Sequence, residues 1–308
     1  MYARRAVTHV FLPAIIAINF ISFTHYIHAQ RCQMAHDKNA LKVLQDSAAT
    51  GDANAQCGLG RQYEYALGVP LDYKQSLVWL LKSAEQGDIT AQVELGVVYD
   101  KMQDYAQAFT WYSKAAEEGN ARAEYNLGLA YGNGESVPKD LGQASAWFRK
   151  AADQGDALAQ SNLAVNYEHG LGVPQDYLQA ADWYRKAAEK GFAEAQYGLG
   201  FLYLNGYGVP KDFNQATTWM LKAAEQGETK AQFNLGVCFL NGTGVSRDLN
   251  EGYFWIFLAN ARTTDSGLKQ YTENALREDA KVMKKSDIKS AQKRAQAWLN
   301  EHPAKVEP

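Results

Sequence analysis

Apolar side chains recur along most of the chain at helical spacing, in short stretches separated by turns rich in glycine and proline. Residues 159–167 place alanine, leucine and tyrosine on one face of an amphipathic helix. Two glycines and a proline in residues 169–174 end it. A second helix is expected from Asp176 to about Lys190, and Gly191 supplies the left-handed residue that often closes a helix. The segment therefore predicts a pair of helices.

This helix pair occurs six times with a nearly constant period. The second helices carry tryptophans separated by 32, 36, 36, 36 and 36 residues: Trp79, Trp111, Trp147, Trp183, Trp219 and Trp255. The first helices carry a Leu-Gly pair at the same period, with Ala164 replacing glycine in the fourth copy. An isolated pair cannot bury its apolar face, so the copies are predicted to stack into one elongated all-α solenoid.

Each second helix begins with an aspartate that is followed three residues later by glutamine or glutamate. The aspartates are Asp72, Asp104, Asp140, Asp176, Asp212 and Asp248. This is the spacing of a capping box, in which the first side chain accepts a bond from the backbone and the second donates back. In the second copy the preceding loop is four residues shorter, yet the aspartate remains. The helix start is predicted to be required and the loop length to vary.

The Leu-Gly site and the repeated aromatic residues predict how the helices pack. Ala164 indicates that the Leu-Gly site needs a small side chain for helix contact rather than a positive φ, which alanine resists. The tryptophans, and the aromatic residue three positions after each Leu-Gly pair, fall on the expected packing face. We therefore interpret them as core residues and not as stacking platforms for sugars or single strands.

These motifs resemble the Sel1-like repeat family, which is related to tetratricopeptide repeats. Residues 193–227, AEAQYGLGFLYLNGYGVPKDFNQATTWMLKAAEQG, show the pattern nearly complete, and the resemblance covers roughly residues 40–260. It implies antiparallel helix pairs in a right-handed superhelix that acts as an adaptor for protein partners. Many bacterial members of the family carry a signal peptide and work outside the cytoplasm.

The layout along the chain follows from the repeats. We expect a signal peptide at residues 1–29, a capping helix in 30–50, six repeats in 51–262, capping helices in 263–300 and a tail at 301–308. Near the end, five basic residues predict the charged outer face that a terminal unit needs for solubility: Lys284, Lys285, Lys289, Lys293 and Arg294.

The first residues have the composition of an export signal. Arg4 and Arg5 precede an apolar stretch, and a small residue, Ala29, follows a short polar segment. Export to the periplasm or the medium is the prediction. The alternative is an uncleaved inner-membrane anchor at residues 6–27, which would be the chain's only association with a membrane.

Composition excludes several functions. Lys and Arg number 31 against 34 Asp and Glu, so the basic surplus of a nucleic-acid-binding chain is absent. Six His and three Cys argue against a zinc or thiolate-bound cofactor, and no cofactor is expected. The glycine-rich loops precede helices that begin with aspartate, which would repel a phosphate; we interpret them as turns.

An enzymatic alternative comes from the same family. Some cysteine-rich members resemble β-lactam-binding hydrolases and pair cysteines in each repeat, whereas this chain has only Cys32, Cys57 and Cys238. Cys32 and Cys57 are able to pair, and Cys238 is predicted to be buried. His169 is the only central histidine and is interpreted as a solvated turn residue. We therefore predict a non-enzymatic scaffold without catalytic residues or a metal.

The candidate binding residues lie just before each Leu-Gly pair. Related helical repeats direct this position into the concave groove, where an asparagine amide can clamp the backbone of an extended peptide. The polar residues at this position are Glu94, Asn126, Asn162 and Asn234. We predict that they contact a protein segment; the alternative is that the asparagines only satisfy neighbouring backbone groups.

Overall fold

The computed structural model describes residues 38–303, which form fifteen α-helices and no strand. These residues divide into two units, 38–166 with 170–174 and 167–169 with 175–303. The first unit holds α2 (Lys38–Ala49), α3 (Ala53–Glu64), α4 (Tyr73–Ala84), α5 (Ile89–Lys101), α6 (Tyr105–Glu117), α7 (Ala121–Asn133), α8 (Leu141–Asp153) and most of α9 (Ala157–His169). The second holds α10 (Tyr177–Glu189), α11 (Ala193–Asn205), α12 (Phe213–Glu225), α13 (Thr229–Asn241), α14 (Leu249–Arg262), α15 (Ser266–Ala280) and α16 (Lys285–Glu301).

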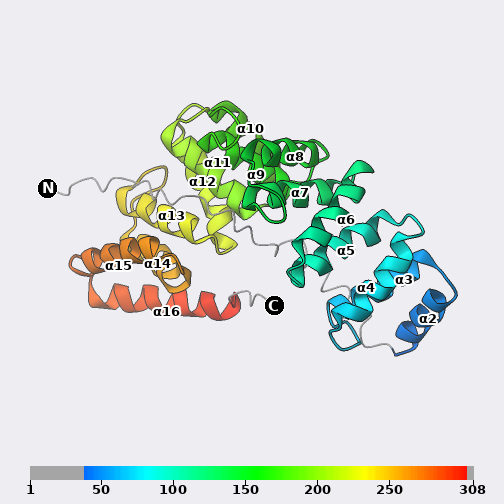
Figure 1. Cartoon of the computed structure of the whole chain (residues 1–308). Helices are drawn as coiled ribbons and strands as arrows, with labels where there is room; N and C mark the ends of the chain where they lie inside the picture. Colours follow the sequence, from blue (N-terminus) through cyan, green and yellow to red (C-terminus); the bar gives the residue numbers. More distant parts are fainter. Residues whose placement is uncertain (1–37, 304–308) are drawn as a thin grey trace. The chain divides into compact units, whose positions relative to one another are not determined.

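Within each unit, most consecutive helices pack against one another, and at the C-terminal end both α15 and α16 pack on α14 (Figure 1). We call the first helix of a repeat the A helix (α3, α5, α7, α9, α11, α13) and the second the B helix (α4, α6, α8, α10, α12, α14). A and B helices pack within a repeat, as α5 does with α6, and B packs on the next A, as α6 does on α7. The predicted all-α solenoid of helix pairs is confirmed.

The B helices begin at the predicted aspartates. Asp72 accepts a hydrogen bond from the Gln75 amide at 3.0 Å, and the other five aspartates form the same bond. The second bond of a capping box would run from the N–H of Asp72 to the side chain three residues later. Here that N–H donates instead to the carbonyl of Tyr63 at 3.1 Å. The same bond recurs in every repeat, and it satisfies one of the carbonyls that the end of an A helix leaves unpaired.

The residue after each tryptophan fills the centre of the repeat. These residues are at most 4% exposed: Leu80, Tyr112, Phe148, Tyr184, Met220 and Ile256. In five repeats the side chain lies on the glycine of the Leu-Gly pair, so that a Cβ added to Gly96 would come within 2.3 Å of the Tyr112 ring. In the fourth repeat, where Ala164 replaces glycine, Tyr184 contacts Gly198 of the following repeat. The glycine is thus required for close approach of the helices, as predicted.

The tryptophans are less buried than predicted. Trp183 and Trp255 are buried, whereas Trp79, Trp111, Trp147 and Trp219 are only partly so. Neighbouring positions on a helix point about 100° apart, so only one of the two large residues can face the A helix. In the first five repeats a lysine three residues later places its ammonium 3.6 to 5.3 Å from the indole centre and covers the ring.

The loops between A and B helices are tight turns. Gly172 has a φ of +71°, and a Cβ there would come within 2.0 Å of the Leu141 carbonyl oxygen at the start of the preceding B helix. Gly208 and Gly244 contact the preceding B helix in the same way. The glycines therefore serve the backbone of the turn, which supports the structural interpretation over a phosphate cradle.

At the ends of the described residues, α2 lies within the predicted N-terminal capping segment and α15 within the C-terminal one, while α16 extends one residue beyond it, to Glu301. The five predicted basic residues are exposed, and Arg294 also forms an ion pair with Glu251 at 2.7 Å. None of the helices in residues 38–303 has the length and apolar character needed to cross a bilayer. The predicted signal peptide, the alternative anchor at 6–27 and Cys32 lie outside the described residues.

Candidate functional site

The four predicted binding residues lie on A helices and are buried rather than open to solvent. Glu94 is 1% exposed, Asn126 4%, Asn162 7% and Asn234 5%. The side chain of Asn234 donates to the Tyr197 hydroxyl at 3.2 Å. The Nδ2 groups of Asn126 and Asn162 have no hydrogen-bond partner among the described residues. None of these donors satisfies a backbone group, and contact with a partner stays a prediction.

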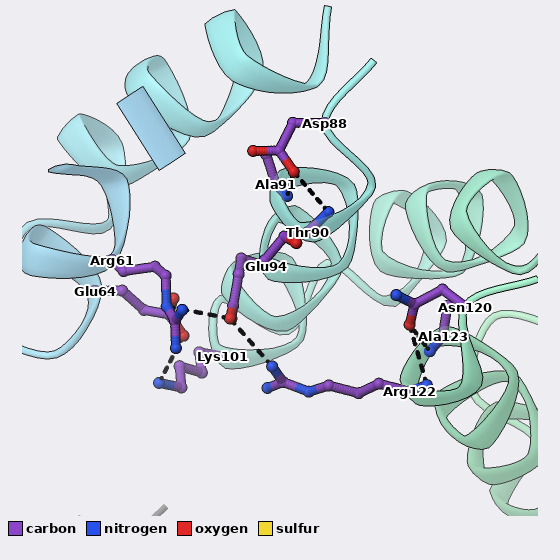
Figure 2. A network of polar contacts seen from close by, with 10 residues as sticks. All are labelled: Arg61, Glu64, Asp88, Thr90, Ala91, Glu94, Lys101, Asn120, Arg122 and Ala123. Carbon is purple, nitrogen blue, oxygen red and sulfur yellow. Dashed lines mark hydrogen bonds and ion pairs between the residues drawn. The ribbon is translucent and has the colours of Figure 1, made fainter. Parts of the chain in front are cut away.

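Glu94 lies at the centre of a network of charges (Figure 2). Its Oε1 is 3.2 Å from Nε of Arg61 on α3 and 3.1 Å from Nη1 of Arg122 on α7. Beside it, Lys101 Nζ is 3.1 Å from Oε1 of Glu64. Three consecutive A helices are thereby joined through their side chains.

The starts of these helices fix the positions of the charged residues. Asp88 accepts bonds from the Thr90 and Ala91 amides at the N-terminus of α5, six residues before Glu94 (Figure 2). Asn120 caps α7 in the same way, with bonds from the amides of Arg122 and Ala123. Arg122 therefore lies in the first turn of α7, close enough to bond to the neighbouring A helix.

The network places more positive than negative charge on this part of the A-helix face. Three basic groups surround two carboxylates that are almost fully buried. Burial raises the pKa of Glu64, and the charge of Glu94 raises it further, while Lys101 opposes both. Burial would lower the pKa of Arg122, but Glu94, Tyr65 and Tyr112 together outweigh it and the net shift is upward. The ion pairs thus compensate for the burial of the two carboxylates, which have almost no contact with water.

A cavity of about 180 Å³ lies next to this network, between the second and third repeats. Its lining comes from α5, α6, α7 and the following loop: Asp100, Tyr105, Phe109, Tyr112, Asn126, Leu129, Ala130, Asn133 and Glu135. The Tyr112 hydroxyl donates to Asp100 at 2.6 Å, and the Asn133 amide donates to Glu135 at 3.3 Å. Burial raises the pKa of Asp100 to about 6; the bond from Tyr112 opposes the shift and the charge of Glu135 adds to it.

Aromatic side chains occupy the corresponding positions in the fifth repeat. Phe201 replaces Leu129 and Tyr207 replaces Glu135 at the same distance from the Leu-Gly pair. The two rings lie 6.4 Å apart in edge-to-face contact, and Tyr207 also stacks on Tyr177 at 4.8 Å. In the fifth repeat, two contacting rings therefore stand at the positions where Leu129 and Glu135 line the cavity between repeats two and three.

Sequence reasoning did not single out the charged partners or Asp100. A signal was present, because an acid follows the Leu-Gly pair by four residues in three copies (Glu64, Asp100, Glu168). In two of these copies a tyrosine follows the tryptophan, and both tyrosines bond to the acid: Tyr112 to Asp100 and Tyr184 to Glu168 at 2.7 Å. Comparing the repeats position by position would have found this pair.

Features of an enzyme or metal site are few in the described part of the chain. Residues 38–303 contain no group of three or more His, Cys, Asp or Glu able to hold a metal. His169 is exposed and is the last residue of α9 rather than part of the loop. Cys57 and Cys238 are both buried, and burial raises the pKa of each thiol to about 12. Such thiols are poor nucleophiles.

Tandem helix pairs of this geometry define the class of α-solenoid repeat proteins. The chain belongs to the Sel1 repeat family, which matches at residues 53–88, 89–120, 121–156, 157–192, 193–228 and 229–261. Proteins with Sel1 repeats are generally scaffolds for protein interactions. A comparison with curated proteins found no match.

Solved structures of the same family resemble this chain. A Sel1 repeat protein from Oxalobacter formigenes is 29% identical, with a TM-score of 0.61, and the alignment covers 79% of this chain and 95% of that one. A protective antigen present in uropathogenic Escherichia coli strains is 25% identical, with a TM-score of 0.46 and coverages of 92% and 86%. The first of these likenesses supports the solenoid fold.

Proposed function

We propose that this chain is a non-enzymatic scaffold that holds an extended segment of a partner protein along its A helices. The observation that carries the proposal is the pair of buried amides, Asn126 and Asn162, whose Nδ2 groups have no partner among the described residues. A buried donor left unpaired costs about 1–3 kcal/mol. Both Nδ2 atoms have almost no accessible surface, so binding requires the side chain to turn its donor toward the segment. A main-chain carbonyl of the segment would then satisfy the donor, because extended peptides present such acceptors at regular intervals.

The proposal includes export, so that the partner is a protein of the bacterial envelope or the surroundings. Its basis is the basic, apolar and small-residue order of residues 1–29. The alternative location is the inner membrane, through residues 6–27. No specific observation favours hydrolysis of β-lactams, and nitrocefin is expected to remain intact with the purified protein.

Replacement of Asn126, Asn162 and Asn234 together by alanine tests the scaffold proposal. Glycine occupies this position in the first and fifth repeats, at Gly58 and Gly198, so the fold accepts small residues there. Proteins are captured from envelope and medium fractions with wild-type and variant chains of equal thermal stability. We expect the variant to lose a partner that the wild type retains.

Two outcomes would contradict the proposal. Undiminished capture by the variant would show that the amides do not bind the segment. Absence of the chain, with its mature N-terminus, from both fractions would refute the export part alone.

A further inference from the structure

The cavity between the second and third repeats combines acidic and aromatic side chains. Asp100 and Glu135 both line it, and neither carboxylate has an ion pair with a described basic side chain. Three aromatic rings complete the lining: Tyr105, Phe109 and Tyr112. Carboxylates attract a cation, and aromatic faces stabilise one within about 6 Å of the ring centre.

One residue of the cavity lining carries an unused hydrogen-bond donor. Asn126 lines it, is only 4% exposed, and has an Nδ2 group without a partner among the residues that the structure describes. A simple cation cannot accept a hydrogen bond, so it would leave the Asn126 donor unpaired. The donor and the carboxylates together match a ligand that has both a positive group and a nearby carbonyl. An arginine or lysine residue within a peptide has both.

The size of the cavity limits the ligand. At about 180 Å³ it is smaller than the roughly 300–1,000 Å³ of pockets that enclose whole small molecules or cofactors. One long side chain fits these dimensions. A planar guanidinium can bond to two carboxylates and stack on an aromatic ring, which favours arginine over lysine.

We propose that this cavity receives an arginine side chain from the partner segment, and that Asn126 turns its amide to donate to that segment's backbone. The proposal rests on the scaffold function and specifies the chemistry of its partner. Asp100 and Glu135 select the positive charge, and Tyr105, Phe109 and Tyr112 surround the side chain. In the fifth repeat, Phe201 and Tyr207 take the places of Leu129 and Glu135 and their rings contact each other. We therefore expect no arginine to bind there.

The test is a titration of the full chain with acetyl-Gly-Arg-Gly-amide, followed by nuclear magnetic resonance. The matched probe is the same peptide with citrulline, which keeps the shape of arginine without its charge. We expect the arginine peptide to shift resonances of α5, α6 and α7 and to bind at least about tenfold more tightly, since hydrogen bonds to charged groups are the stronger ones.

Two variants and a control locate the binding. Leu129→Phe fills the cavity with the residue that the fold already accepts at position 201, and Glu135→Gln removes one of its charges. Each is expected to weaken arginine-peptide binding by about tenfold or more. Glu117→Gln removes a charge from an exposed position of α6 and should leave binding unchanged.

Several results would overturn the proposal: equal binding of the citrulline peptide, wild-type affinity in both cavity variants, or no binding of the arginine peptide. Tighter binding of acetyl-Gly-Glu-Gly-amide would show that the neighbouring basic groups dominate instead. If the Leu129→Phe chain still captures a protein partner that the triple asparagine variant loses, the arginine proposal fails while the scaffold function stands.

Discussion

At the scale of single residues, the A-helix face of the first unit owes its character to a few buried polar groups. Glu94 joins Arg61 and Arg122, whereas the equivalent Asn126 and Asn162 keep an unpaired donor. Residues at one repeat position therefore differ in chemistry while the backbone around them stays the same. Such variation lets a repeat protein recognise a particular segment.

Asp100 is predicted to make stability depend on pH. Its pKa rises from 3.8 to about 6 on folding, chiefly through burial, so the folded chain holds the proton more tightly than the unfolded chain. Its contribution to the free energy of unfolding is therefore greatest below about pH 4 and is lost as the pH rises to about 6.

Urea unfolding of the wild type and of Asp100→Asn at pH 5 and pH 7.5 measures this effect. Asparagine cannot titrate, so we expect the wild type to gain stability relative to the variant at pH 5. An unchanged difference between the two proteins at both pH values would show that Asp100 does not titrate in this range.

At the scale of helices and loops, the predictions that were confirmed depended on residues close together in the sequence. The aspartates begin every B helix as expected, because a cap depends on residues three positions apart. Burial of the tryptophans and the Glu94 network could not be predicted in the same way. They depend on the rotation of one helix against the next and on residues such as Arg61 and Arg122, which are distant in sequence.

The loop between α7 and α8 carries a strained residue that predicts a stabilising change. Ser136 has a φ of +64°, where the other long loops have glycine at the equivalent position (Gly68, Gly172, Gly208, Gly244). A left-handed conformation costs a residue with a side chain about 1–2 kcal/mol. We expect Ser136→Gly to raise the free energy of unfolding by about 1 kcal/mol in urea.

The reverse change provides the control for this loop. Gly172→Ser would bring a Cβ within 2.0 Å of the Leu141 carbonyl oxygen and should destabilise the chain. A loss of stability in Ser136→Gly would mean that the serine side chain contributes more than its backbone strain costs.

At the scale of the whole molecule, the described repeats give a succession of A helices in each unit. Within each unit, the helix pairs pack mainly on their neighbours in sequence, as in other repeat proteins. Function in such a chain depends on which repeats carry distinctive side chains. Repeats one to three do so here, through the charged network and the adjoining cavity.

Photochemical cross-linking in cells is the measurement that tests the scaffold account most directly. A photoreactive analogue of the same size as leucine, which leaves the cavity open, is placed at Leu129, beside Asn126 in the cavity lining, or at Val78, on the exposed face of α4. The account predicts that position 129 cross-links to one defined segment of a partner protein and that position 78 does not. Identical products from both positions, or none from position 129, would contradict it.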